Sequence, residues 1–158
     1  MTGPRHPDLK AASPQAAAEP VRVLAAVIRR DGRYLVCQRP AHKRHGGSWE
    51  FPGGKIHAGE SLLDAARREL AEELSLEVVQ VGSVLFAGSD VGSEFIIEFV
   101  EVVVAGEPVA LEHDQVRWLT HSEILALEMA PADRALAATV SADMNAHLEF
   151  VLTGGDIA

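Results

Sequence analysis

The feature that most constrains the fold of this chain is a run of glycine, glutamate and arginine at fixed spacing in residues 54–76. The run reads Gly54–x5–Glu60–x7–Arg68–Glu69–Leu70–x–Glu72–Glu73–x–Ser75–Leu76. On a helix from residue 61 to residue 74, three of the glutamates fall within one arc of about 100°, and leucines and alanines fill the adjoining arc. The spacing therefore predicts an amphipathic helix whose acidic face is formed by Glu69, Glu72 and Glu73.

A divalent cation would explain this acidic face. Glu69 and Glu73 are like charges four residues apart, a pairing that costs roughly 0.2–0.5 kcal/mol if nothing offsets it. Mg²⁺ prefers carboxylate oxygens and commonly binds a substrate phosphate as well. The residues directly before the helix allow close backbone approach and supply a positive charge; they are Gly53, Gly54 and Lys55.

The alternative is a solvated acidic helix face, which is what most charge clusters are. Arg68 can pair with Glu72 four residues later, and this pair would explain one glutamate structurally. It would leave Glu69, Glu73 and the glycine turn unexplained, so a metal site is the favoured interpretation.

The run resembles the signature of the Nudix hydrolases, metal-dependent enzymes that cleave a nucleoside diphosphate linked to another moiety. Only Ser75 departs from it, because the family has glycine there. The resemblance implies an α/β protein with the Nudix fold, an α/β/α sandwich that holds a mixed β-sheet between helices. It also implies Mg²⁺ as the cofactor, with Mn²⁺ as a possible substitute.

The resemblance further assigns roles to individual residues. Glu69, Glu72 and Glu73 are the implied catalytic residues, with Glu69 preferred as the general base or water-orienting ligand. The implied metal ligands in this part of the chain are Gly53, Glu69, Glu72 and Glu73.

Two flanking segments narrow the resemblance to the MutT-like branch, which includes oxidised-nucleotide and CTP pyrophosphohydrolases. These segments are Gln38–Arg39–Pro40 and Trp49–Glu50–Phe51–Pro52–Gly53–Gly54–Lys55. In that branch, the residues that match Arg39 and Lys55 contact the substrate phosphates. A glutamate before a tryptophan-containing strand is a further metal ligand, and Glu112 matches it.

Asp133 is the residue that bears on which nucleotide base the protein recognises. It follows Ala130–Pro131–Ala132, a stretch similar to one in the CTP pyrophosphohydrolases, whereas the oxidised-guanine hydrolases have asparagine at this place. A carboxylate only accepts hydrogen bonds, so Asp133 would favour a donor-rich edge, such as cytosine N4–H₂ or the N–H of 8-oxoguanine. The alternative is that it only complements the helix dipole. Phe51 and residues 23–25 would line the rest of the base pocket.

The remaining pattern predicts one mixed α/β domain. Strands are expected at 21–28, 33–38, 78–87, 95–104 and 115–119, with a hairpin at Asp31–Gly32 and with 49–51 extended. A short helix follows Thr120, and a last helix begins at Pro131 and runs to about residue 150. The predicted organisation is a disordered proline- and alanine-rich arm at 1–19, a Nudix domain at 20–150 and a tail at 151–158.

Composition bounds the partners and the compartment. The net charge of −9 argues against broad binding to nucleic acid or anionic membranes. No apolar run approaches 18 residues, and the N-terminus lacks a hydrophobic signal region. The single cysteine, Cys37, excludes a disulfide framework and indicates a reducing compartment, the cytoplasm. A monomer and a homodimer both remain open.

The predicted function is that of a Mg²⁺-dependent (deoxy)nucleoside triphosphate pyrophosphohydrolase that sanitises the nucleotide pool and releases a monophosphate and pyrophosphate. ADP-ribose hydrolases usually carry a proline, and dinucleoside-polyphosphate hydrolases a tyrosine, some 15–18 residues past the signature. Residues 91–94 contain neither, which weakens both alternatives. A non-catalytic nucleotide-sensing module is a third alternative, although such modules typically lose signature glutamates and this chain keeps Glu60, Glu69, Glu72 and Glu73.

Overall fold

Strand β1 (Val21–Val27) runs through the middle of a mixed four-stranded sheet in the computed structural model, which describes residues 19–139. The sheet order is β5-β1-β7-β6. β1 pairs in parallel with β7 (Phe95–Ala105) and antiparallel with β5 (Gly53–Lys55), and β6 (Glu77–Gly88) pairs antiparallel with β7. The predicted mixed sheet is thus confirmed.

A second, smaller sheet continues from the first. Its central strand β3 (Arg33–Gln38) pairs antiparallel with β2 (Arg29–Arg30), β4 (Trp49–Glu50) and β8 (Gln115–Leu119). The strand predicted at 21–28 therefore ends one residue early, because the chain passes from one sheet to the other at Ile28. The turn between β2 and β3 has φ of 51° at Asp31 and 73° at Gly32, as a type I′ hairpin requires.

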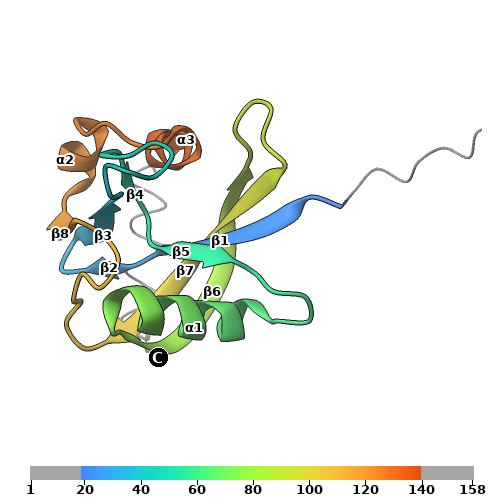
Figure 1. The fold of residues 1–158 in the computed structure, drawn as a ribbon. Coiled ribbons are helices and arrows are strands. Elements are labelled where there is room, and N and C mark those ends of the chain that lie inside the picture. The colour runs from blue at the N-terminus through green and yellow to red at the C-terminus, as the bar shows by residue number, and fades with distance from the viewer. Residues whose placement is uncertain (1–18, 140–158) are drawn as a thin grey trace, which may run out of the picture.

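Hydrophobic cores lie on both faces of the sheet, which makes the molecule an α/β/α sandwich. Because strand side chains alternate, Leu24 and Ala26 of β1 join the core against α1 (Leu62–Leu74). Ala25 and Val27 join the core against α2 (His121–Leu125) and α3 (Pro131–Thr139). Figure 1 shows α1 on one side of the sheet and α2 and α3 on the other.

Local capping explains where α1 begins and ends. Ser61 Oγ accepts a hydrogen bond from Asp64 N at 3.1 Å. At the other end, Ser75 has φ 56° and ψ 33°, and Leu76 N donates to Leu70 O at 3.1 Å. Ser75 thus occupies the left-handed conformation that the family glycine would adopt without strain.

Part of the predicted organisation lies outside the described residues. This is true of residues 1–18 of the predicted arm, of the last helix beyond Thr139, and of the tail at 151–158. Within residues 19–139, no helix is long and apolar enough to cross a membrane.

Candidate functional site

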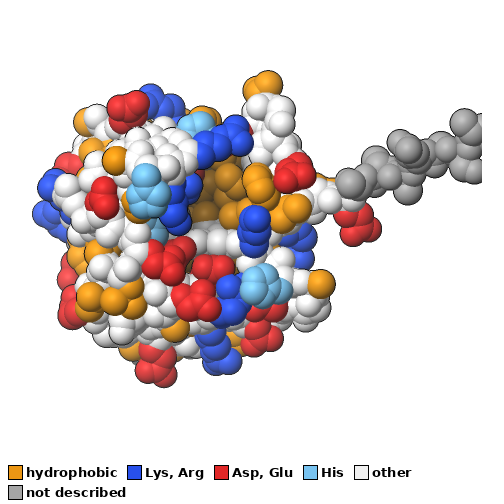
Figure 2. Space-filling view, viewed as in Figure 1, with side chains coloured by type: hydrophobic (Ala, Val, Ile, Leu, Met, Phe, Trp, Pro, Cys, Tyr) orange, Lys and Arg blue, Asp and Glu red, His pale blue; other side chains and the backbone are white. Residues whose placement is uncertain are grey.

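A cavity of about 320 Å³ opens on one face of the sandwich, where β1, β5, α1 and three loops meet. Figure 2 shows a hollow with hydrophobic side chains inside, Lys and Arg side chains around it and a group of Asp and Glu side chains below it. Seven of the nine predicted site residues line the cavity: Arg39, Phe51, Gly53, Lys55, Glu73, Glu112 and Asp133. Glu69 and Glu72 are not among the lining residues.

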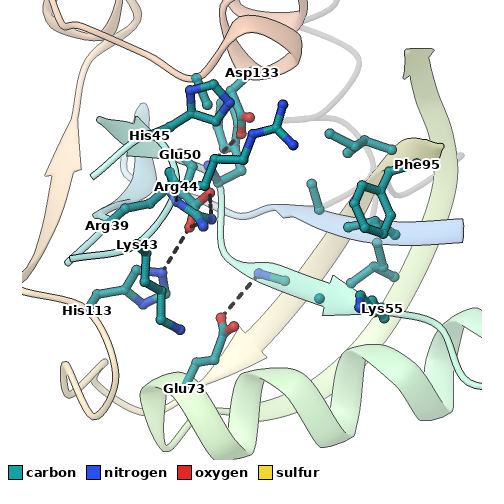
Figure 3. A pocket seen from close by; sticks show the side chains of 18 of the residues that line it. Arg39, Lys43, Arg44, His45, Glu50, Lys55, Glu73, Phe95, His113 and Asp133 are labelled. Carbon is teal, nitrogen blue, oxygen red and sulfur yellow. Dashed lines mark hydrogen bonds and ion pairs between the residues drawn. The ribbon is translucent and has the colours of Figure 1, made fainter. Parts of the chain in front are cut away.

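Glu73 joins helix α1 to the glycine turn at one end of the cavity. It is buried, and its Oε2 accepts a hydrogen bond from Gly53 N at 3.2 Å (Figure 3). Burial, which is the largest cause, and the nearby negative charges of Glu69, Glu112 and Glu50 together raise the pKa of Glu73 to about 8. A cation bound at this end of the cavity would offset the charges of the neighbouring glutamates and favour the ionised form of Glu73.

Glu69 lies behind Gly54. A Cβ atom at Gly54 would overlap the Glu69 carboxylate, so a larger residue there would displace the carboxylate from this position. Arg68 Nη1 donates to Glu69 Oε1 at 2.7 Å. The signature thus brings Glu69 against the turn that carries Gly53 and Lys55, although Glu69 does not itself line the cavity.

Arg68 has a different main partner from the one considered in the sequence. It donates two hydrogen bonds to Glu60, at 2.7 and 2.9 Å, and one to Lys55 O at 2.9 Å. Hydrogen bonds from Arg68 hold the pKa of Glu60 down at about 2. Glu72 Oε2 lies 3.9 Å from Arg68 Nη1, and the Glu72 side chain is 55% exposed. Arg68 therefore ties the signature loop to the helix and leaves Glu72 open to solvent.

The acidic end suits a hard divalent cation without forming a complete cage. Among residues 19–139, no three His, Cys, Asp or Glu side chains are arranged to hold a metal ion by themselves. Mg²⁺ usually keeps several waters and is bound by one or two carboxylates together with substrate phosphates. The buried Glu73 carboxylate and the nearby charges of Glu69 and Glu112 provide oxygen donors of the right kind for such an ion.

Basic side chains line the wall above the acidic end. Arg39 Nη1 donates to Glu50 at 2.9 and 3.2 Å, and Lys55 Nζ lies 5.3 Å from the centre of the Phe95 ring. Lys43 and Arg44, which were not among the predicted site residues, also line the cavity. Their position in a glycine-containing basic loop between Arg39 and Trp49 was the available signal.

Asp133 lies at the other end of the cavity, at the start of α3 (Figure 3). It is 4% exposed, and its Oδ1 accepts a hydrogen bond from Phe51 N at 2.9 Å. Burial, which is the largest cause, and the charges of Glu50 and Asp90 together raise the pKa of Asp133 to about 8. The raised pKa favours the protonated form near pH 7, which can donate as well as accept; the accept-only carboxylate expected from the sequence stays a prediction.

Phe51 and the β1 residues form the apolar floor. Phe51 packs edge-on against Phe99, with 6.1 Å between ring centroids, and belongs to the core that faces α3. Val23, Leu24 and Ala25 line the cavity together with Phe51. The floor is thus formed by mostly buried residues at the edge of the hydrophobic cores, and its role as a base pocket stays a prediction.

His113 also lines the cavity and was not among the predicted site residues. Its Nε2 lies 3.3 Å from Glu50 Oε1, and its side chain is 7% exposed. Seven scattered histidines without metal-site spacing gave no reason to single it out.

Comparisons with known proteins identify the family of this chain. A family model described as NUDIX domain matches residues 18–140. The chain is 40% identical over 116 residues to the CTP pyrophosphohydrolase of Escherichia coli (strain K12), a match that covers 72% of this chain and 85% of that protein. It is 36% identical over 126 residues to a Mycobacterium tuberculosis protein named "Putative 8-oxo-dGTP diphosphatase 2", covering 78% of this chain and 89% of the relative.

A solved structure shows the same fold. The crystal structure of a MutT Nudix hydrolase from Burkholderia pseudomallei superposes with a TM-score of 0.67 at 27% identity, covering 77% of this chain and 98% of that one. Together with the glycine turn, the glutamates of α1 and the mixed sheet, these matches show that the chain belongs to the Nudix hydrolases, a family of metal-dependent enzymes.

Proposed function

We propose that this enzyme is a pyrophosphohydrolase of (deoxy)nucleoside triphosphates that releases a nucleoside monophosphate and pyrophosphate. One observation carries the proposal: a single cavity has carboxylates at one end, basic side chains along its wall, and an apolar floor with Asp133 at the other end. A nucleotide has the same order of parts, from charged phosphates to a flat base with polar edges. The names of the two relatives described above, which refer to nucleoside triphosphates, support the same substrate class.

Mg²⁺, with Mn²⁺ as a substitute, is the proposed cofactor. Glu73, Glu69, Glu72 and Glu112 would hold it, together with the backbone of Gly53. When bound, such an ion neutralises phosphate oxygens and lowers the pKa of a water molecule that attacks phosphorus.

The other proposed roles belong to the residues of the chain. Glu69, which Arg68 holds beside the glycine turn, is the proposed group that orients the water and takes its proton. Arg39 and Lys55 bind the phosphates, because charge-assisted hydrogen bonds to phosphate are strong. Phe51 contacts the face of the base, and Asp133 contacts its edge.

The proposed partners and compartment follow from charge and cysteine content. The partners are small nucleotides, and the net charge of −9 argues against nucleic acid as a substrate. The proposed compartment is the cytoplasm, consistent with a single, buried, unpaired Cys37, and the active form is a monomer or a homodimer.

A hydrolysis screen tests the proposal. Ordinary, 5-methylated and oxidised (deoxy)nucleoside triphosphates, ADP-ribose and dinucleoside polyphosphates are each incubated with Mg²⁺, with Mn²⁺ and with EDTA. We expect monophosphate and pyrophosphate from at least one triphosphate, no turnover in EDTA, and wild-type rates for the control Glu77→Gln, an exposed glutamate outside the cavity. Release of orthophosphate, or turnover confined to ADP-ribose or dinucleoside polyphosphates, would contradict it.

A further inference from the structure

His113 is one end of a hydrogen-bonded chain that leads to the proposed phosphate-binding arginine. Its Nε2 lies 3.3 Å from Glu50 Oε1, and the Glu50 carboxylate accepts from Arg39 Nη1 at 2.9 and 3.2 Å. Arg39 Nε donates to Arg44 O at 2.8 Å. The Arg39 guanidinium is thus held by hydrogen bonds from Nε and from Nη1. The bonds from Nη1 depend on the position of the Glu50 carboxylate.

The burial of His113 shows that the ring has a defined orientation. Its side chain is 7% exposed. With Nε2 as the donor, the Glu50 carboxylate accepts the hydrogen bond. Within the described part of the chain, Nδ1 is buried and has no hydrogen-bond partner. Among residues 19–139, the contact with Glu50 is therefore the hydrogen bond that the structure gives this ring.

The segment 111–114 connects the two ends of the proposed phosphate site. Its first N–H donates to Glu73 O at 3.0 Å, and its last N–H donates to Gln38 O at 3.1 Å. One of its two middle residues, Glu112, adds negative charge near Glu73, and the other, His113, contacts Glu50. Residues 111–114 therefore lie next to both the acidic end of the cavity and the Glu50 carboxylate that binds Arg39.

We propose that His113 is a positioning residue, which holds the Glu50 carboxylate and thereby sets the orientation of Arg39 toward the substrate phosphates. This inference rests on the proposed function for its substrate. His113 contacts Glu50 rather than the phosphates, and its contribution is to keep Arg39 in one orientation before the nucleotide binds. Groups held in place in advance bind with less loss of conformational freedom.

The first test separates binding from turnover. His113→Leu removes the donor to Glu50, and His113→Gln keeps an N–H donor of similar reach. His42→Leu is the matched control, since His42 is an exposed histidine of the neighbouring loop that does not line the cavity. With the triphosphate that the wild type hydrolyses fastest, His113→Leu should raise KM roughly tenfold and change kcat less than about threefold. His113→Gln and His42→Leu should keep wild-type KM.

The second test needs no substrate. The NMR signal of the Arg39 Nε–H group is assigned as the one that is absent in Arg39→Lys. The rate at which this hydrogen exchanges with water is then measured. Exchange should be slow in the wild type, His113→Gln and His42→Leu, and clearly faster in His113→Leu. If His113→Leu does not fold, His113→Asn, whose side chain is too short to reach Glu50, replaces it.

The two readouts separate this inference from the proposed function. If the wild type hydrolyses no triphosphate, the proposed function fails, while Arg39 exchange still decides the role of His113. A folded His113→Leu with unchanged Arg39 exchange, or with a fall in kcat at constant KM, would overturn the proposal.

Discussion

The N–H of Gly53 donates to the buried carboxylate of Glu73 at 3.2 Å, so the glycine turn and helix α1 meet through a hydrogen bond at the acidic end of the cavity. The contact fixes Glu73 Oε2 and leaves Oε1 available for the proposed metal ion. It also means that the proposed metal site depends on the backbone of β5 as much as on the helix.

Glu73→Gln and Glu69→Gln should each lower kcat by about 10²-fold or more, the scale of a lost positioned acid–base or charge-stabilising group. Both variants should fold, because neither substitution removes core volume. Steady-state kinetics with Mg²⁺ and circular dichroism check the two statements. Near-full turnover in a folded variant would remove that glutamate from the mechanism.

Gly54→Ala should lower kcat through Glu69, because the added Cβ would overlap the Glu69 carboxylate. If displacement of Glu69 is the whole effect, Gly54→Ala should add little to Glu69→Gln in a double-mutant cycle. The kinetics of the two single variants and the double variant measure this coupling. Independent, multiplicative losses would indicate that Gly54 acts in another way.

Ser75→Gly should stabilise the protein without changing its activity. Ser75 has φ 56°, and the left-handed region costs a non-glycine residue about 1 kcal/mol. For a domain of this size, that corresponds to a rise in Tm of about 2–4 °C. Ser75→Ala is the control, since alanine meets the same backbone strain; equal Tm values for the two variants would contradict the explanation.

Asp133→Asn should gain stability relative to the wild type as pH rises from about 4 to 8. Burial raises the pKa of Asp133 to about 8 in the folded state, above the value of about 3.9 for an unfolded chain. Stability from the protonated form is complete below the unfolded pKa and is lost as pH rises toward the folded pKa. Asparagine does not titrate, so the difference in Tm between the two proteins should grow across this window and level off above pH 8.

The same substitution should change substrate preference mainly at high pH. Below pH 8, protonated Asp133 and an asparagine can both donate and accept, so the ratio of kcat/KM between cytosine and 8-oxoguanine triphosphates should be similar in the two proteins. At pH 9 the wild-type carboxylate only accepts, and Asp133→Asn should favour 8-oxoguanine by about tenfold, which corresponds to an edge contact of 1–3 kcal/mol. A loss that is equal for all substrates would leave Asp133 with a structural role only.

Features encoded by neighbouring residues could be predicted from the sequence. Helix α1, the type I′ turn at Asp31–Gly32 and the left-handed Ser75 all follow from local capping and turn chemistry. Strands β3 and β8 match the predicted ranges residue for residue, since their apolar patterns are bounded by polar segments.

Features that depend on tertiary packing could not be predicted. No local signal separates Arg68–Glu60 from Arg68–Glu72, because Glu60 reaches the arginine only after the signature loop folds back on the helix. The burial of Asp133 beside Glu50, and hence its protonation, depends on three segments that are distant in sequence. His113 approaches Glu50 of β4 only in the folded chain, because β8 and β4 both pair with β3.

The alternation of β1 has a consequence for how such an enzyme can diversify. Leu24 packs in one core, Ala25 packs in the other, and both border the cavity. A shift of β1 by one residue would exchange the two faces and disrupt both cores together with the cavity floor. New substrate preferences are therefore expected to arise by substitution in the loops that border the cavity, at 39–48, 89–94 and 106–114, while the strand beneath them tolerates little change.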